Sequence, residues 1–214
     1  HKQPRLTFGV ACFQGDSSIK SFTLSAAQKT LPDYAFKDCK QLKTFTMHDN
    51  VKVIGKQALA ATKIETIHIP KNLEEVGDRA FSNLQKLVEF TIDSDCRNFG
   101  IENGFLYQKG EEKTIIAFPQ AKECDELIIP AGYANIASGA FAYCKFFSVD
   151  FQGSLVNVFN FAFAHCTNLT GTLKLPSGVT VFGDQCFLNC NKINAVEIPN
   201  GTKSLAKECF RQCY

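Results

Sequence analysis

Ten cysteines and four histidines are the side chains of this sequence that could act as a nucleophile, a metal ligand or a disulfide partner. His165 and Cys166 are adjacent and together would supply a general base and a thiol nucleophile. Neighbouring residues in a turn point apart, so we expect an exposed His165 beside a buried Cys166. The sequence also lacks zinc-type C-x-x-C spacing and the common serine-hydrolase, phosphate and dinucleotide motifs. We therefore predict no catalytic residue, no metal and no cofactor.

Cys96 and Cys124 differ from the other cysteines because they flank a long segment, residues 97–123, that interrupts a repeat. A disulfide between them would close this segment and stabilise it. The alternative is two free thiols, and both remain open at this point.

Five cysteines occupy one place of that repeat: Cys39, Cys144, Cys166, Cys190 and Cys213. Stacked strands would hold such residues about 4.8 Å apart. A disulfide needs Cβ atoms about 3.5–4.5 Å apart with a crossed dihedral angle. We therefore expect this column to consist of free, buried thiols that act as small apolar residues.

The repeat itself is marked by an Ala or Cys followed by a Phe or Leu, a pair that we call the anchor. The anchors are Cys12-Phe13, Ala35-Phe36, Ala58-Leu59, Ala80-Phe81, Ala140-Phe141, Ala162-Phe163, Cys186-Phe187 and Cys209-Phe210. They are separated by 23, 23, 22, 60, 22, 24 and 23 residues, and they explain much of the excess of phenylalanine, 20 residues beside no tryptophan. Such a regular step is typical of a stacked repeat protein.

Each predicted coil contains two apolar segments. One alternates apolar, outward-facing and apolar residues, as in Phe45-Thr46-Met47, which predicts a half-buried strand. The other ends four residues before the anchor, as at Ile54. A single coil buries too few apolar side chains to offset its backbone entropy, so the coils must stack.

The fused pattern, L-x-x-I-x-I-P-x-x-V-x-x-I-G-x-x-A-F-x-x-C, resembles the BspA-like class of leucine-rich repeats. It is clearest from Leu42 to Ala80 and from Leu169 to Phe187. Residues 103–107, with the sequence NGFLY, and residues 113–119 are similar to the G-x-L-Y … L-I-x-Y-P insert of that family. The resemblance implies an α/β repeat fold, a right-handed solenoid with short parallel strands on one face and short turns or helical turns opposite.

The same resemblance implies one inserted hairpin, which we place at about residues 97–123, with re-entry into the array at Leu127. We expect residues 1–214 to form a single leucine-rich-repeat domain of eight coils. Both ends of the sequence fall inside a coil, whereas repeat arrays need polar caps. We therefore expect a fragment of a longer array.

The residues between the paired apolar positions should form an outward-facing column on the strands. Solenoid curvature turns such a column into a continuous recognition surface. The predicted partner-binding residues are Thr23, Thr46, His68, Thr91, Asp150, Lys174 and Glu197. The alternative is that threonine is simply favoured at exposed strand positions.

The net charge is only +2, and the basic residues do not cluster into a stripe. Both observations argue against nucleic-acid binding. Apolar runs of only a few residues argue against membrane insertion of this segment. The resemblance implies a non-enzymatic interaction module of a cell-surface or secreted protein from a bacterium or parasitic protist. It further implies adhesion to host matrix, host cells or other microbes, through a host-derived protein or glycan ligand.

Two alternatives remain. An intracellular leucine-rich-repeat scaffold would suit the unpaired cysteines. An enzyme is the least favoured, because the polar residues of the insert do not combine into an acid, a base and a nucleophile. Those residues are Glu102, Tyr107, Lys109, Glu111 and Lys113.

Overall fold

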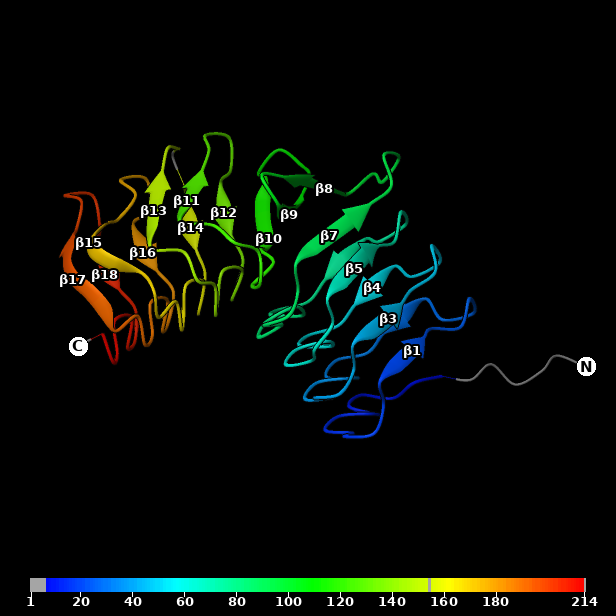
Figure 1. The fold of residues 1–214 in the computed structure, drawn as a ribbon. Coiled ribbons are helices and arrows are strands. Elements are labelled where there is room, and N and C mark those ends of the chain that lie inside the picture. Colours follow the sequence, from blue (N-terminus) through cyan, green and yellow to red (C-terminus); the bar gives the residue numbers. More distant parts are fainter. Residues whose placement is uncertain (1–6, 154, 214) are drawn as a thin grey trace, which may run out of the picture.

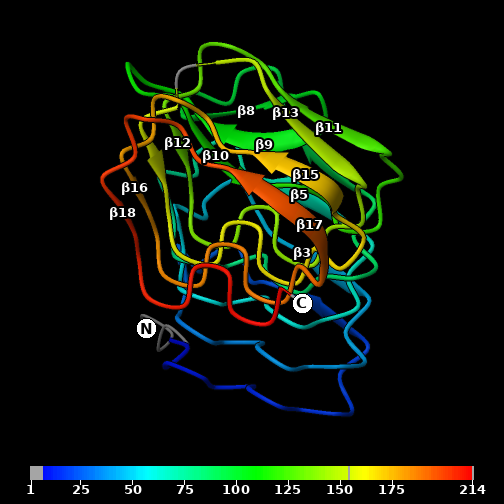
Figure 2. The same ribbon diagram turned by 90° about the vertical axis from the view of Figure 1, so that its left-hand side faces the viewer.

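The computed structural model describes residues 7–153 and 155–213. Short strands and turns form a curved, parallel-strand solenoid of about eight coils, with the first and the last coil at opposite ends of the stack (Figure 1). Each coil carries a first strand on one face and a second strand on the other, so that the two sets lie on opposite sides of the stack (Figure 2).

The first strands are β1 (Ser21–Thr23), β3 (Thr44–Thr46), β5 (Thr66–Ile69), β7 (Glu89–Ile92), β11 (Glu126–Ile129), β13 (Ser148–Phe151), β15 (Thr170–Lys174) and β17 (Lys192–Glu197). The second strands are β2 (Thr30–Leu31), β4 (Val53–Ile54), β6 (Glu75–Val76), β10 (Thr114–Ala117), β12 (Asn135–Ile136), β14 (Asn157–Val158), β16 (Val181–Phe182) and β18 (Ser204–Leu205). Two further strands, β8 (Phe99–Glu102) and β9 (Phe105–Gln108), form the inserted hairpin.

Equivalent residues of neighbouring coils pair with one another. Phe22 of β1 pairs with Phe45 of β3, and Phe182 of β16 pairs with Leu205 of β18, both in parallel strands. The anchor turns continue this ladder, because the Phe36 amide donates to the Ala58 carbonyl at 2.8 Å. The predicted translational repeat is therefore confirmed.

The expectation of helical turns, and with it an α/β fold, is wrong: the described residues contain no helix. Each anchor turn instead holds two residues with left-handed backbone, as at Tyr34 (φ 58°) and Asp38 (φ 62°). Gln57 and Ala61 repeat this arrangement in the next coil. Only three residues lie between the two left-handed positions, too few to start a helix. No helix in the described part of the chain could therefore cross a membrane.

The anchor phenylalanines form the centre of the core. Phe141, Phe163 and Phe187 are fully buried, and their rings stack on one another with centroids 5.1 and 5.2 Å apart. Phe13 and Phe36 repeat the stacking at 4.9 Å in the first coils. The small residue before each phenylalanine leaves room for this close approach of the coils.

The inserted hairpin is confirmed, and its turn is Asn103-Gly104, with φ of 51° and 90°. Positive φ at both central residues is what a tight two-residue hairpin requires. β8 pairs with β9, and β9 pairs with β10, both antiparallel. Leu106 of β9 packs in the core of the N-terminal coils, whereas Phe105 packs in the core of the C-terminal coils. The hairpin thus joins the two halves of the solenoid.

The chain re-enters the array earlier than the sequence suggested, so the prediction of re-entry at Leu127 is wrong. Ile115 of β10 already pairs in parallel with Ile136 of β12. The Phe118 amide then donates to the Ala140 carbonyl at 2.9 Å, as an anchor amide does in other coils. Ala117-Phe118 is therefore an additional anchor, which the sequence pattern missed because its turn is shorter.

Candidate functional site

The predicted partner-binding residues lie on the first strands, at equivalent places of successive coils. We call this row the strand face: Thr23, Thr46, His68, Thr91, Ile128, Asp150, Lys174 and Glu197. All are exposed except Thr91, which is partly buried. Alternation along the strands explains this exposure, because the flanking residues point into the core. Ile198, beside Glu197, is the exception and is 51% exposed.

Strand pairing aligns the strand face in adjacent coils. Thr23 is in register with Thr46, and His68 with Thr91. In the C-terminal coils Lys174 is in register with Glu197. The first strands form four parallel pairs, β1–β3, β5–β7, β11–β13 and β15–β17. The hairpin strands β8 and β9 and the second strand β10 lie between β7 and β11 in the sequence, so we divide the strand face into a first block up to β7 and a second block from β11.

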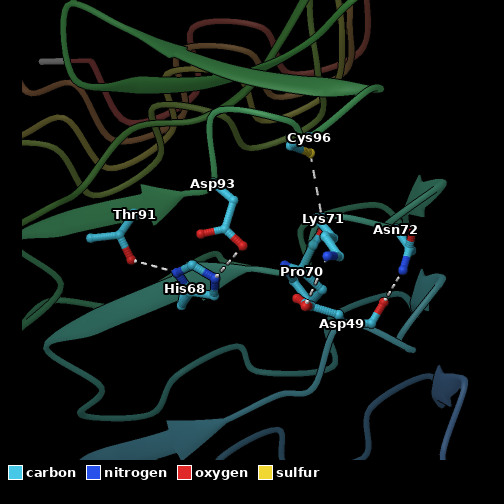
Figure 3. A network of polar contacts seen from close by, with 8 residues as sticks. All are labelled: Asp49, His68, Pro70, Lys71, Asn72, Thr91, Asp93 and Cys96. Carbon is cyan, nitrogen blue, oxygen red and sulfur yellow. Dashed lines mark hydrogen bonds and ion pairs between the residues drawn. The ribbon is translucent and has the colours of Figure 1, made fainter.

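His68 is the centre of a polar network in the first block (Figure 3). Its Nδ1 lies 3.0 Å from the Thr91 hydroxyl oxygen, and its Nε2 lies 3.8 Å from an Asp93 carboxylate oxygen. On the neighbouring turns the Lys71 ammonium lies 3.7 Å from the Asp49 carboxylate. Residues from three successive coils therefore present two neighbouring sets of polar groups, one around His68 and one formed by Lys71 and Asp49.

The second block carries charges of both signs. Lys174 Nζ lies 3.7 Å from Glu197 Oε2, with the two side chains 74% and 60% exposed. Exposed ion pairs of this kind contribute about 0–1 kcal/mol. The Asp150 carboxylate accepts a hydrogen bond from the Gln152 amide at 3.0 Å. Such weakly held side chains can exchange their present contacts for contacts with a partner at little cost.

One group of side chains among the described residues has the spacing of metal ligands, namely Asp49, His68 and Asp93, whose ligand atoms lie within 4.8 Å of one another. All three are solvent-accessible, and Lys71 already places a positive charge beside Asp49. Asp49 and Asp93 could not be recognised from the sequence, because they follow strands of different coils and have no local spacing signal.

The side chains of His165 and Cys166 have different contact partners. The Cys166 thiol is buried and donates to the Phe141 carbonyl at 3.1 Å. The His165 ring stacks on Tyr143, with centroids 4.5 Å apart, and burial lowers the pKa of His165. The expectation that His165 is exposed is wrong, since it is half-buried against the neighbouring coil.

The column cysteines are free thiols, as predicted, and they add a second ladder of cross-coil hydrogen bonds. Four of the five thiols donate to anchor carbonyls of the preceding coil: Cys39 to Phe13 at 2.9 Å, Cys166 to Phe141 at 3.1 Å, Cys190 to Phe163 at 3.2 Å and Cys213 to Phe187 at 2.9 Å. Each of these carbonyls also accepts a backbone amide of its own turn, as Phe13 does from Asp16 at 3.1 Å, so the thiol is a second donor that links the coils.

Cys96 and Cys124 are also separate thiols here. Cys96 is buried with the N-terminal coils, and its sulfur lies 4.0 Å from the Pro70 carbonyl oxygen. The Cys124 thiol donates to the Glu126 carbonyl at 3.0 Å and packs against the C-terminal coils. A disulfide between them stays a prediction.

Burial raises the pKa of Cys144, Cys166 and Cys186. The folded state therefore keeps these protons, whereas unfolded thiols ionise above about pH 8.5. We expect thiol ionisation to leave the unfolding free energy unchanged below that pH and to lower it as the pH rises further. Thermal melts between pH 7 and pH 10 measure this loss.

Iodoacetamide at pH 8 provides the matched chemical test. The exposed Cys12 should react, whereas Cys144 and Cys166 should be protected until the protein unfolds. Equal labelling of all three in the native protein, with no loss of stability at high pH, would contradict the buried thiol column.

Comparison with protein families agrees with this geometry. A family model described as the BspA-type leucine-rich repeat region, with 6 copies, matches residues 7–110 and 111–214. The chain belongs to the BspA-type leucine-rich repeat family. The family resemblance found in the repeat and insert motifs is thus confirmed. No protein with a curated description matches the chain significantly.

Solved structures show the same BspA-type fold. A leucine-rich cell surface protein from Faecalibacterium prausnitzii superimposes with a TM-score of 0.75 at 24% identity, over 95% of this chain and 60% of that one. A leucine-rich repeat protein from Eubacterium ventriosum gives a TM-score of 0.74 at 20% identity, over 95% and 66% of the two chains. The pneumococcal vaccine antigen PcpA gives 0.69 at 20% identity, over 87% and 56%. The present chain thus spans about 60% of the F. prausnitzii structure.

Proposed function

We propose that this BspA-type solenoid is a protein-interaction module that binds its partner through the strand face. The observation that carries the proposal is the in-register alignment of exposed polar side chains, such as Thr23 with Thr46, across successive coils. Short side chains such as Thr46 lose little rotamer entropy when a partner covers them. The rigid stack holds these groups at a fixed spacing, which favours a large and specific contact.

We further propose a cell-surface or secreted location and a role in adhesion to host matrix, host cells or other microbes, with a host-derived protein or glycan as the ligand. This rests on the fold, which is shared with a cell surface protein and with a vaccine antigen. We propose that the coils act as one domain, because the hairpin contributes side chains to both cores.

An intracellular scaffold is the second candidate. The free thiols favour it, because reduced cysteines are usual in the cytosol and disulfides are usual outside the cell. A partner found only among host matrix proteins or glycans would support the first candidate over this one.

The strand face is tested by the triple variant Thr46→Lys, His68→Glu and Thr91→Lys. We expect at least a ~100-fold loss of affinity, because bulky charges would oppose the partner at three neighbouring coils. The melting temperature should change little, since Thr46 and His68 are exposed. Surface plasmon resonance against purified host matrix proteins, together with a glycan array, measures binding.

The matched control is Thr30→Lys, Glu75→Lys and Thr180→Lys, three exposed positions on or beside the second strands. This control should bind as the unchanged protein does. Full binding by the strand-face variant would contradict the proposal and favour the insert, residues 97–123, or the opposite face. Loss of binding in the control alone would place the interaction on the opposite face.

A further inference from the structure

A cleft of about 230 Å³ lies where the N-terminal coils face the C-terminal coils, away from the strand face. Its lining includes Gln57, Arg79 and Asn83 from one half and Tyr143, Phe161 and His165 from the other. This volume is just below the range of about 300–1,000 Å³ that holds drug-sized ligands. The cleft therefore suits a ligand of about one sugar ring.

The shortened anchor turn of the intervening coil accounts for this opening. Ile115 precedes Phe118 by three residues, whereas the paired Ile136 precedes Phe141 by five. With two residues fewer, this turn does not fill the space between its neighbours. The turns on either side meet across it instead, and the Arg79 guanidinium lies 4.5 Å from the centre of the Phe161 ring.

Arg79 is held in place by this ring contact, and no hydrogen bond or ion pair joins its guanidinium to another described residue. A guanidinium stacked on an aromatic face keeps its N–H groups at the edge of the plane, where they match a carboxylate. Arg79 is also only half-buried, so a ligand in the cleft can reach it.

The other polar groups of the cleft favour a ligand that carries hydroxyl groups as well as a negative charge. Lys37 and Arg79 exceed the single carboxylate of Asp38 by one positive charge. Asp38 repels a bare anion but accepts hydrogen bonds from hydroxyl groups, and Gln57 offers both a donor and an acceptor. The Asn83 carbonyl oxygen already accepts from Gln85, which leaves the Asn83 amide hydrogens as donors.

His165 adds one further donor. Its Nδ1 lies 3.2 Å from the Asn189 amide nitrogen, and burial lowers the pKa of His165, which favours the neutral ring. In the tautomer that accepts from Asn189 at Nδ1, the proton resides on Nε2. The cleft thus combines the Arg79 guanidinium with the Asp38 carboxylate and with the neutral side chains of Gln57, Asn83 and His165.

We propose that this cleft binds a hydroxylated carboxylate of about one ring, that is, an acidic sugar of the uronate type. Arg79 binds the carboxylate, while Asp38, Gln57 and Asn83 bind the hydroxyl groups. The site is independent of the strand face, and its binding should persist in the strand-face triple variant.

Isothermal titration of the whole chain with sodium glucuronate tests the proposal, with glucose and inorganic phosphate as comparisons. We expect saturable binding of glucuronate that is at least ~10-fold tighter than binding of either comparison, which is about 1.4 kcal/mol. Glucose lacks the carboxylate. Phosphate carries only one or two P–OH groups near neutral pH and lacks the ring hydroxyl groups that would reach Asp38, Gln57 and Asn83 together.

Two cleft variants should each weaken glucuronate at least ~10-fold. Arg79→Gln removes the charge, and Ala61→Gln fills the cleft without altering the backbone, since Gln212 adopts the same left-handed conformation at the equivalent place. Should Arg79→Gln also loosen the contact with Phe161, Ala61→Gln still reports on the cleft alone. The control Arg211→Gln removes an exposed charge from the last coil and should bind normally.

Absence of saturable glucuronate binding would overturn the proposal. Equal binding of phosphate, or undiminished binding by both cleft variants, would also overturn it.

Discussion

Replacing Phe163 with alanine should lower the free energy of unfolding by about 3–5 kcal/mol. The ring is fully buried and stacks on Phe141 and Phe187, so its removal leaves a cavity that touches three coils. Coils depend on their neighbours for stability, and the damage should therefore spread along the C-terminal coils. Urea denaturation followed by circular dichroism measures the change.

Phe159→Ala is the matched control, because the same side chain is removed from a site that is 45% exposed. We expect a loss of less than about 1 kcal/mol there, in line with a surface substitution. Equal losses for the two variants would show that the stacked phenylalanines are not the centre of the core.

Gly55→Ala should destabilise the chain by about 3 kcal/mol, the upper end of the range for overpacking. A Cβ atom at this place would lie 2.5 Å from the Asp33 amide nitrogen and 2.7 Å from the Pro32 carbonyl carbon. These are backbone atoms of the preceding coil, which can move only if the spacing of the coils changes. Thermal and urea unfolding of the variant measure the effect.

Gly9→Ala provides the control for this substitution. Gly9 holds the same place of the repeat in the first described coil, and a Cβ atom there would meet nothing within 4 Å. We expect no loss of stability, and a gain of about 0.4–1 kcal/mol from the restricted unfolded chain. A similar loss of stability in both variants would mean that the close approach of the coils is not the reason for glycine at position 55.

The anchor repeat predicted most of the fold because each coil makes the same contacts as the next. The pairing of Phe22 with Phe45, the free thiol of Cys166 and the exposure of His68 all follow from the period. The prediction of helical turns was wrong because residues with a left-handed backbone, such as Gln57, have no signature in the pattern of apolar residues. The turn, rather than the residue type, imposes the backbone conformation at these places.

The anchor at Phe118 and the cleft were missed for a related reason. A shortened turn breaks the spacing on which recognition of the repeat depends, and Phe118 therefore fell inside the insert. Arg79 and Phe161 lie far apart in the sequence and meet only because of that turn. The strand face was predictable from alternation, and its interruption between β7 and β11 falls at the predicted insert, residues 97–123.

The inserted hairpin has a consequence for how a long ligand would engage this surface. If all coils were identical, a ligand with a repeating structure could bind in many equivalent positions, each shifted by one coil. The hairpin and the short turn at Phe118 occur once in the described coils and interrupt that uniformity. Because these features are not repeated, a ligand that spans both blocks has one preferred alignment rather than several.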